Sequence, residues 1–396
     1  MNPFTVPRRS TAALAVLLTT ALTLLTAAPA QADGIRARQW GLDAMNTQQA
    51  WQTTKGAGVT VAVLDTGVDA DHPDLAGNVA PGKDLVGFGA RRGDRAWARH
   101  GTAMAGIIAG HGHGPGNTEG VMGIAPEARI LPVRVILEDG DPSRSKARST
   151  RGSALAEGIR WAADRGADVI NLSLGDDSAS AHADSGEDEA IQYALRKGVA
   201  VVASAGNGGE KGDRVSYPAA YPGVITATAV DRYGTRAAFS TRRWYATVSA
   251  PGVDVIIADP DRKYYEGWGT SAAAAFVSGA VALLRSAHPD LTPAQLKTLL
   301  ADTARDAPSG GRDDSRGFGF VDPAAALRAA ERLTPEGLKP ASHGERYFGS
   351  GPDGAASDGG ATAWAAPLAG GTGAVLLVTA VVLWRGRRPD PDARIH

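Results

Sequence analysis

The sequence of 396 residues contains no cysteine. This absence excludes a disulfide framework, a thiolate metal site and a cysteine nucleophile together. If the protein forms a covalent intermediate with a substrate, its nucleophile must be Ser, Thr, Lys or a carboxylate.

The chain also lacks an excess of either charge, because 41 Lys and Arg residues are balanced by 42 Asp and Glu residues, for a formal net charge of −1. Dedicated nucleic-acid-binding proteins usually carry a basic excess, so nucleic acid is not expected as a partner. Apolar residues make up 43% of the chain and charged residues 21%, which is typical of globular proteins and argues against a disordered or fibrous chain.

Residues 1–32 have the pattern of a secretory signal peptide. Arg8 and Arg9 form a positive n-region, residues 12–26 are an apolar run, and AQA at residues 30–32 is a small-x-small cleavage site. The alternative is an N-terminal membrane anchor, but the apolar run is short for a membrane span. The two arginines leave both general and twin-arginine export open.

The C-terminal end has a different pattern, that of a linker followed by a membrane span. Residues 335–360 are rich in Gly, Pro, Ser and Asp, which predicts a flexible linker. Residues 361–384 carry no charge, and a helix of that length spans roughly 36 Å, enough for a hydrocarbon core of about 30 Å. Arginines follow at once, so the tail at 385–396 is predicted to be cytoplasmic and the preceding domain extracellular. The alternative is a buried core helix.

The domain between these ends, residues 33–334, is predicted to be α/β. Stretches with helical spacing at 102–109, 152–165 and 187–197 alternate with short apolar runs. Unbroken β-branched runs suit strands covered on both faces, so we expect a doubly wound, mostly parallel sheet with helices on both faces. Functional residues should then lie at the carboxyl ends of the strands. The apolar runs are residues 59–64, 130–135, 169–172, 199–203 and 224–229.

The first candidate for chemistry is Asp65, which ends the strand-like run VTVAVL and precedes a Gly turn. A carboxylate in this place can serve in catalysis or be a solvated turn residue. Asp-Thr-Gly is also the signature of aspartic proteases, which need two carboxylates that share a proton. The other candidate for such a pair is Asp184, but no apolar strand precedes it, so this mechanism is not favoured.

The second candidate is His100, which opens the helical segment HGTAMAGIIAG. An imidazole at a helix N-terminus can have its charge state tuned, because the helix dipole disfavours the cation there. His111 and His113 follow in a Gly-rich stretch. These two histidines could belong to a metal site, but a flexible exposed loop is favoured, and no metal ligand is predicted.

Two further segments supply a hydroxyl and an amide. Ser271 opens the long apolar helix expected after GWGT, where it is either a helix cap or a nucleophile aimed by the turn. Asn207 follows the strand-like run VAVVA and a Gly, where it is either a turn residue or the donor of an amide to an oxyanion. Together with Asp65 and His100, these residues complete the set of groups for acyl transfer to a serine.

The segments LDTGVD, HGTAMAG, SAGN and GTSAAAAFVSG, in this order, resemble those of the subtilisin-like serine proteases. The resemblance runs from about residue 40 to residue 333. It implies that Asp65, His100 and Ser271 form the catalytic triad, and that Asn207 and the Ser271 backbone amide stabilise the oxyanion. It also implies that SLG at residues 173–175, namely Ser173, Leu174 and Gly175, pairs with the substrate backbone.

Within this family the two ends of the chain are similar to those of the mycosins, membrane-anchored subtilases of type VII secretion. The resemblance implies a serine endopeptidase on the outer face of the cell membrane, with polypeptide substrates, a single membrane span and the type VII secretion machinery as partners. No cofactor is required; many subtilases use calcium, but no Asp-rich loop identifies its ligands here.

The sequence departs from the family pattern at two positions after the nucleophile. Ala272 stands where a bulky residue is usual, and Ala275 stands where Pro is usual. Ala is the best helix former, so the helix should survive, and the packing beneath Ser271 is the property these changes affect. They keep open an alternative function, that of a subtilase-fold structural subunit of a membrane secretion complex with weak or no catalysis.

Overall fold

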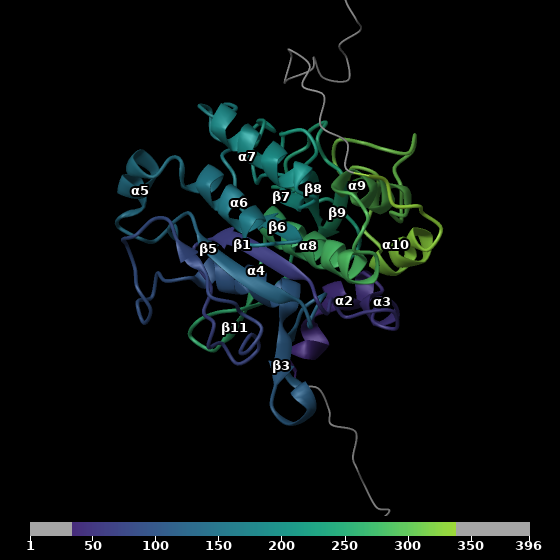
Figure 1. Cartoon of the computed structure of the whole chain (residues 1–396), viewed down its shortest axis with the longest axis horizontal. Helices are drawn as coiled ribbons and strands as arrows, with labels where there is room; N and C mark the ends of the chain where they lie inside the picture. Colours follow the sequence, from purple (N-terminus) through teal and green to yellow (C-terminus); the bar gives the residue numbers. More distant parts are fainter. Residues whose placement is uncertain (1–33, 338–396) are drawn as a thin grey trace, which may run out of the picture. The chain divides into compact units, whose positions relative to one another are not determined.

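A computed structural model of the protein describes residues 34–337, whose centre is a seven-stranded sheet (Figure 1). All neighbouring strands in this sheet are parallel. The predicted signal peptide (1–32) and span (361–384) lie outside the described residues. In spatial order the strands are β2 (Lys83–Asp84), β5 (Arg129–Arg134), β1 (Thr60–Asp65), β6 (Val169–Leu172), β7 (Ala200–Ser204), β8 (Ile225–Val230) and β9 (Val248–Pro251).

The five apolar runs of the sequence form the five central strands, which confirms the predicted parallel α/β fold. The two outer strands were not predicted. β2 has two exposed residues and therefore no apolar pattern. β9 ends in Pro251, which lacks the N–H of a ladder hydrogen bond and is tolerated because the strand lies at the edge of the sheet.

Each central strand is apolar throughout because both faces of the sheet are covered. Along β1, Val61 and Val63 belong to one buried cluster, whereas Ala62 and Leu64 belong to the other. The helices α4 (Arg99–Ala109) and α8 (Thr270–Ala287) supply the first cluster, and α6 (Ala154–Asp164) and α7 (Ser185–Arg196) supply the second. The sheet is thus the middle of three layers (Figure 1).

The remaining elements lie around these layers. Asp184 caps α7 by accepting the backbone N–H of Glu187 at 2.9 Å, which gives this carboxylate a structural place. The other elements are η1 (Arg36–Arg38), α2 (Trp40–Ala44), α3 (Thr47–Ala50), β3 (His111–His113), η2 (Pro115–Asn117), β4 (Glu119–Met122), α5 (Arg144–Thr150), β10 (Val255–Ala258), β11 (Tyr264–Gly267), α9 (Pro293–Asp302) and α10 (Pro323–Ala330).

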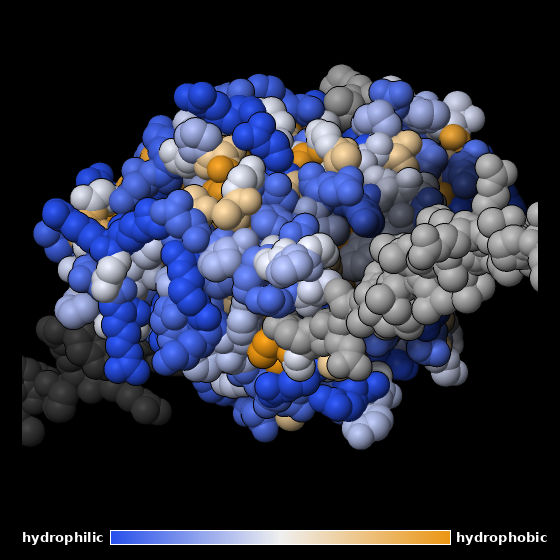
Figure 2. Space-filling view, turned by 90° about the horizontal axis from the view of Figure 1, so that it is seen from below, coloured by the Kyte–Doolittle hydropathy of each residue, from blue (hydrophilic) through white to orange (hydrophobic). Residues whose placement is uncertain are grey.

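The helix α8 runs through the core behind the sheet. Within residues 34–337 it is the one helix long and apolar enough to cross a membrane by length and composition, yet 83% of its most apolar window is buried in the fold. Its apolar character is therefore explained by its place in the core. Figure 2 shows a mostly hydrophilic outer surface on one face, with apolar residues in small patches, as is usual for a globular domain.

The segment with His111 and His113 is ordered, so the prediction of a flexible exposed loop was wrong. It forms β3, which pairs antiparallel with β4. The Nδ1 atom of His113 lies 2.6 Å from the carboxylate of Asp74, and the Nε2 atom of His111 lies 3.0 Å from the carbonyl oxygen of Ala76. These partners are more than thirty residues away in sequence, which is why local composition did not identify them.

Candidate active site

The residues predicted from the sequence lie at one edge of the sheet. Asp65 is the last residue of β1, Ser173 directly follows β6, and Asn207 lies three residues after β7. Since β1, β6 and β7 are neighbours and parallel, their carboxyl ends meet at this edge. Ser271 is near the start of α8, which packs against β6 and β7.

The helix α4 approaches the turn after β1 closely enough to bring His100 onto Asp65. The Nδ1 atom of His100 lies 2.9 Å from each carboxylate oxygen of Asp65. A side chain at Gly101 would place its Cβ 2.0 Å from the carbonyl oxygen of Gly67, so this approach requires glycine at 101. The Gly101 backbone N–H also donates to the Thr66 hydroxyl at 3.1 Å, which fastens the helix to the turn.

The carboxylate of Asp65 is fully buried, whereas the His100 side chain is 36% exposed. Desolvation lowers the pKa of His100, but the charge of Asp65 and the hydrogen bond to it outweigh this effect and raise the pKa to about 9. Glu138 adds to the rise; its Oε1 accepts the backbone N–H of His100 at 2.8 Å. The attraction to these carboxylates therefore exceeds the cost of desolvating the charged imidazole.

The hydroxyl of Ser271 is bonded to Ser173, the residue that follows β6, and not to His100. Its Oγ donates to the carbonyl oxygen of Ser173 at 3.0 Å, and the Ser173 hydroxyl in turn donates to the carbonyl oxygen of Ser271 at 2.8 Å. No hydrogen bond joins Ser271 and His100 among the described residues. Catalytic hydrogen bonds are often formed only when substrate is bound, so this geometry is compatible with a nucleophile that turns toward His100 in the complex.

The carboxamide of Asn207 is oriented by Thr270, the residue before Ser271. Its Oδ1 accepts hydrogen bonds from the backbone N–H of Thr270 at 3.1 Å and from the Thr270 hydroxyl at 2.9 Å. Because the oxygen is occupied, the NH2 group points elsewhere and can donate. It lies 3.9 Å from the place a Cβ of Gly269 would occupy, beside the turn that leads into Ser271. This role of Thr270 was not predicted from the sequence.

The two alanines that depart from the family pattern are buried without interrupting the helix. Ala272 is 3% exposed and Ala275 is 0% exposed, and both belong to the core cluster between α8 and the sheet. The helix is continuous from Thr270 to Ala287, as predicted.

The segment predicted to pair with substrate is partly occupied by the protein itself. Leu174 is half-buried, and its carbonyl oxygen accepts the Ser204 hydroxyl at 3.3 Å. Gly175 is exposed and approaches Ser216 so closely that a Cβ would lie 2.8 Å from the Ser216 hydroxyl. This contact explains the need for glycine at 175.

Asp69 and Asp74 each have a cationic or imidazole partner. Asp69 lies 2.7 Å from a guanidinium nitrogen of Arg262, and Asp74 accepts a hydrogen bond from His113. Among residues 34–337 no group of three or more His, Asp or Glu side chains is arranged to hold a metal ion.

Comparison with known proteins identifies the class to which this fold and site belong. Residues 56–320 match the model of the subtilase family of peptidases. The chain therefore belongs to the subtilase family, whose subtilisin-like serine proteases are its relatives. Thermitase from Thermoactinomyces vulgaris is 39% identical over 63% of this chain and 82% of its own length. Fervidolysin from Fervidobacterium pennivorans is 39% identical over 73% of this chain, which spans only 43% of that protein.

Two solved structures of similar fold are those of MycP1 and MycP3. MycP1 from Mycobacterium smegmatis has a TM-score of 0.63 and 31% sequence identity, covering 78% of this chain and 87% of that one. MycP3, a protease from the type VII (ESX-3) secretion system, has a TM-score of 0.60 and 33% identity, covering 73% of this chain and 87% of that one. The chain is thus similar to mycosins in fold and in sequence.

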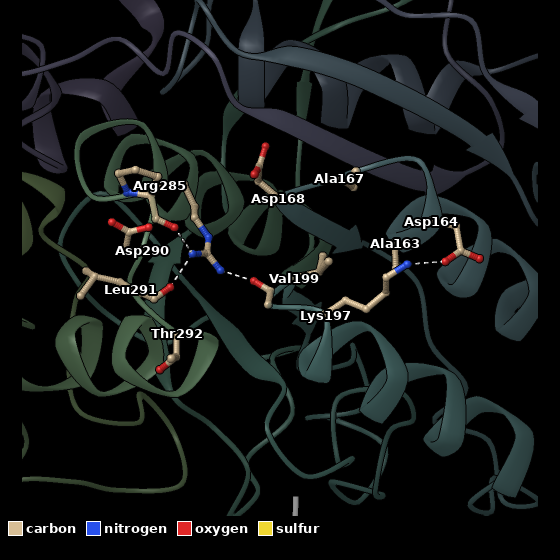
Figure 3. A pocket seen from close by; sticks show the side chains of 13 residues that line it. Ala163, Asp164, Ala167, Asp168, Lys197, Val199, Arg285, Asp290, Leu291 and Thr292 are labelled. Atoms are coloured by element: carbon tan, nitrogen blue, oxygen red, sulfur yellow. Dashed lines mark hydrogen bonds and ion pairs between the residues drawn. The ribbon is translucent and has the colours of Figure 1, made fainter. Parts of the chain in front are cut away.

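A cavity of about 580 Å³ lies at the other end of α8, and Figure 3 shows the residues that line it. Arg285 projects into this region and donates hydrogen bonds to the carbonyl oxygens of Gly198, Pro289 and Leu291. Arg285 is 14 residues after Ser271 on one helix, which corresponds to roughly 21 Å. This cavity is therefore separate from the candidate active site.

Proposed function

We propose that the protein is a serine endopeptidase that hydrolyses peptide bonds through an acyl-enzyme. The Oγ of Ser271 attacks the carbonyl carbon of the substrate while the Nε2 of His100 takes the hydroxyl proton. His100 then gives this proton to the leaving amine, and water completes the hydrolysis by the same sequence. Asp65 keeps the Nδ1–H of His100 toward itself and stabilises the imidazolium.

The observation that carries this proposal is the His100–Asp65 pair. A buried carboxylate that holds one nitrogen of a partly exposed imidazole, with a serine at a nearby helix start, is the arrangement that activates a hydroxyl nucleophile. Asn207 and the backbone N–H of Ser271 are the donors proposed for the oxyanion. Their contribution is made in the transition state, where the negative charge develops.

The polypeptide substrate is proposed to pair with residues 173–175 as an added strand. Gly175 is the exposed member of this segment. The bond from Ser271 to the carbonyl oxygen of Ser173 must break before attack, which frees that oxygen to accept a substrate N–H. Substrate binding and release of the nucleophile are thereby linked.

The proposed location is the outer face of the cell membrane, in association with a type VII secretion system. The likeness to MycP1 and MycP3 supports this part of the proposal, together with the predicted signal peptide and span at the two ends of the sequence.

The test of the proposed activity is hydrolysis of a general peptide substrate by the purified protein and by Ser271→Ala. We expect the variant to lose at least about a thousandfold in kcat while it keeps the circular dichroism spectrum of the parent. Ser286→Ala is the matched control, because this serine lies on the same helix and bonds only to Thr54 and Ala57. Parent-like turnover by Ser271→Ala would show that the nucleophile is another residue.

A second candidate function is that of a structural subunit of a secretion complex with weak catalysis. The observation in its favour is the hydroxyl of Ser271, which is bonded to Ser173 and not to His100. If the parent protein itself shows no turnover and no reaction with a serine-directed probe, this second function replaces the first.

A further inference from the structure

The loop that carries Asn207 is held by its backbone N–H groups, each of which has a different partner. Gly206 donates to the hydroxyl of Thr270 at 3.2 Å, and Gly208 donates to the hydroxyl of Thr241 at 3.0 Å. Gly209 donates to the carbonyl oxygen of Phe239 at 2.8 Å. The fourth donor, the N–H of Asn207 itself, binds a carboxylate.

That carboxylate belongs to Asp177, whose Oδ2 accepts the Asn207 N–H at 3.1 Å. The same oxygen lies 3.2 Å from the place a Cβ of Gly208 would occupy, so the side chain packs along the loop. Asp177 lies two residues after Gly175, in the segment that continues from the substrate edge. It is therefore the link between the segment proposed to bind substrate and the loop proposed to bind the oxyanion.

The bond to Asp177 is the one that holds the backbone of Asn207 itself, since the bonds of Gly206 and Gly208 hold its neighbours. Asn207 is exposed, it lies between glycines, and Gly206 has a φ of +101° that other residues rarely adopt. Thr270 fixes the carboxamide oxygen, but this contact alone does not set the position of the Asn207 backbone. A misplacement of about 1 Å in a catalytic group can cost roughly a hundredfold in rate.

We propose that Asp177 is a positioning residue for the oxyanion donor, an inference that rests on the serine peptidase function proposed above. Its carboxylate acts as a hydrogen-bond acceptor for the Asn207 backbone, not through its charge. A negative charge beside the site of a developing oxyanion opposes that charge, so only the acceptor geometry favours the reaction.

This distinction can be tested with three variants of the full-length protein in detergent, assayed on a neutral peptide substrate. Asp177→Ala removes the acceptor and should lower kcat about tenfold with little change in KM, because the oxyanion donor acts in the transition state. Asp177→Asn keeps an acceptor oxygen and should restore kcat to within about twofold of the parent or above it. Asp176→Ala is the matched control, since this neighbouring carboxylate bonds only to the backbone of Ser178 and should leave kcat unchanged.

A double-mutant cycle with Asn207→Ala separates positioning from a general structural effect. Asn207→Ala alone should lower kcat by about a hundred- to a thousandfold. In that background Asp177→Ala should cost less than about twofold, because the group it positions is gone. Equal losses in both backgrounds, an unchanged kcat in Asp177→Ala, or a loss in Asp177→Asn equal to that in Asp177→Ala would each overturn the proposal. Absence of turnover in the parent would instead overturn the proposed function.

Discussion

At the scale of single residues, the proposed mechanism makes the pH range of activity depend on the charge state of His100. Only neutral His100 can accept the proton of Ser271, so kcat/KM should rise with pH as His100 loses its proton. Desolvation lowers the pKa of His100. The charge of Asp65 and the hydrogen bond to it have a larger effect in the opposite direction, so the pKa is raised from its ordinary value to about 9. We therefore predict an alkaline profile whose rise is centred near that value, measured as kcat/KM between about pH 6 and about pH 11.

Glu138→Gln provides the internal check of this profile. The variant removes a negative charge that raises the pKa of His100, so the pKa should fall and the rise in kcat/KM should move to lower pH. Glutamine keeps the oxygen that accepts the backbone N–H of His100, so the start of α4 should be preserved. Glu331→Gln, at the end of α10, should leave the profile in place. A rise centred below neutrality, or a shift to higher pH in Glu138→Gln, would contradict this assignment.

Candidate site residues could be predicted from the sequence where a polar residue stands at the end of a strand pattern or at the start of a helix pattern. Asp65 follows an apolar run, and His100 and Ser271 each open a helical pattern, so their places were visible in the local sequence. Contacts between segments distant in sequence were not visible. The bond from Ser271 to Ser173 and the bond from Asn207 to Asp177 depend on how neighbouring strands end.

At the scale of elements, the helix α8 connects the candidate active site to the core. Its first turn contains Ser271. Its last turn contains Arg285, which is only 7% exposed and whose guanidinium binds nearby carbonyl oxygens. Of the three residues whose carbonyl oxygens Arg285 binds, Leu291 is buried, Gly198 is half-buried and Pro289 is exposed.

We predict that Arg285→Met destabilises the protein while it leaves the chemistry intact. Loss of the guanidinium leaves the carbonyl oxygen of the buried Leu291 without this donor, which should lower the free energy of unfolding by about 1 to 3 kcal/mol. Because the change is about one helix length from Ser271, kcat at low temperature should stay within about twofold of the parent. Urea denaturation and peptide hydrolysis measure the two quantities. Arg328→Met, on the surface of α10, is the control, and an equal stability in both variants would show that the Arg285 contacts are dispensable.

The central strands could be predicted because burial on both faces makes them continuously apolar. The edge strands and the β3–β4 hairpin escaped prediction because their pairing depends on partners that the local sequence does not show. The fold class thus follows from the interior of the sheet, whereas its margins are set by tertiary contacts.

At the scale of the whole molecule, the predicted topology gives a separable catalytic domain. The residues after 334 still contact α9, since the backbone N–H of Glu336 donates to the Oε1 of Gln295 at 3.1 Å. We predict that a chain ending at Gly337 remains folded and active in solution, whereas the full-length protein stays with the membrane fraction after a high-salt wash. Ultracentrifugation followed by a peptidase assay of both fractions measures this.

The orientation can be read in the same cells with an added protease. The linker at 335–360 should be cut from outside once any outer wall is permeable, while a tag after residue 396 should stay protected. Full-length protein free in the medium, or an inactive and unfolded chain after truncation at Gly337, would contradict the predicted topology.

The central claim, that His100 and Asp65 activate Ser271, is tested most directly by mapping the adduct of a fluorophosphonate probe. The probe reacts rapidly only with a serine whose proton is taken by a base. Mass spectrometry of the labelled parent protein should place the phosphonyl group on Ser271. The variant Asp65→Asn should be labelled more slowly by several orders of magnitude, because the imidazole is then held in the wrong tautomer. An adduct on another serine, or labelling of Ser271 at the same rate in Asp65→Asn, would contradict the account.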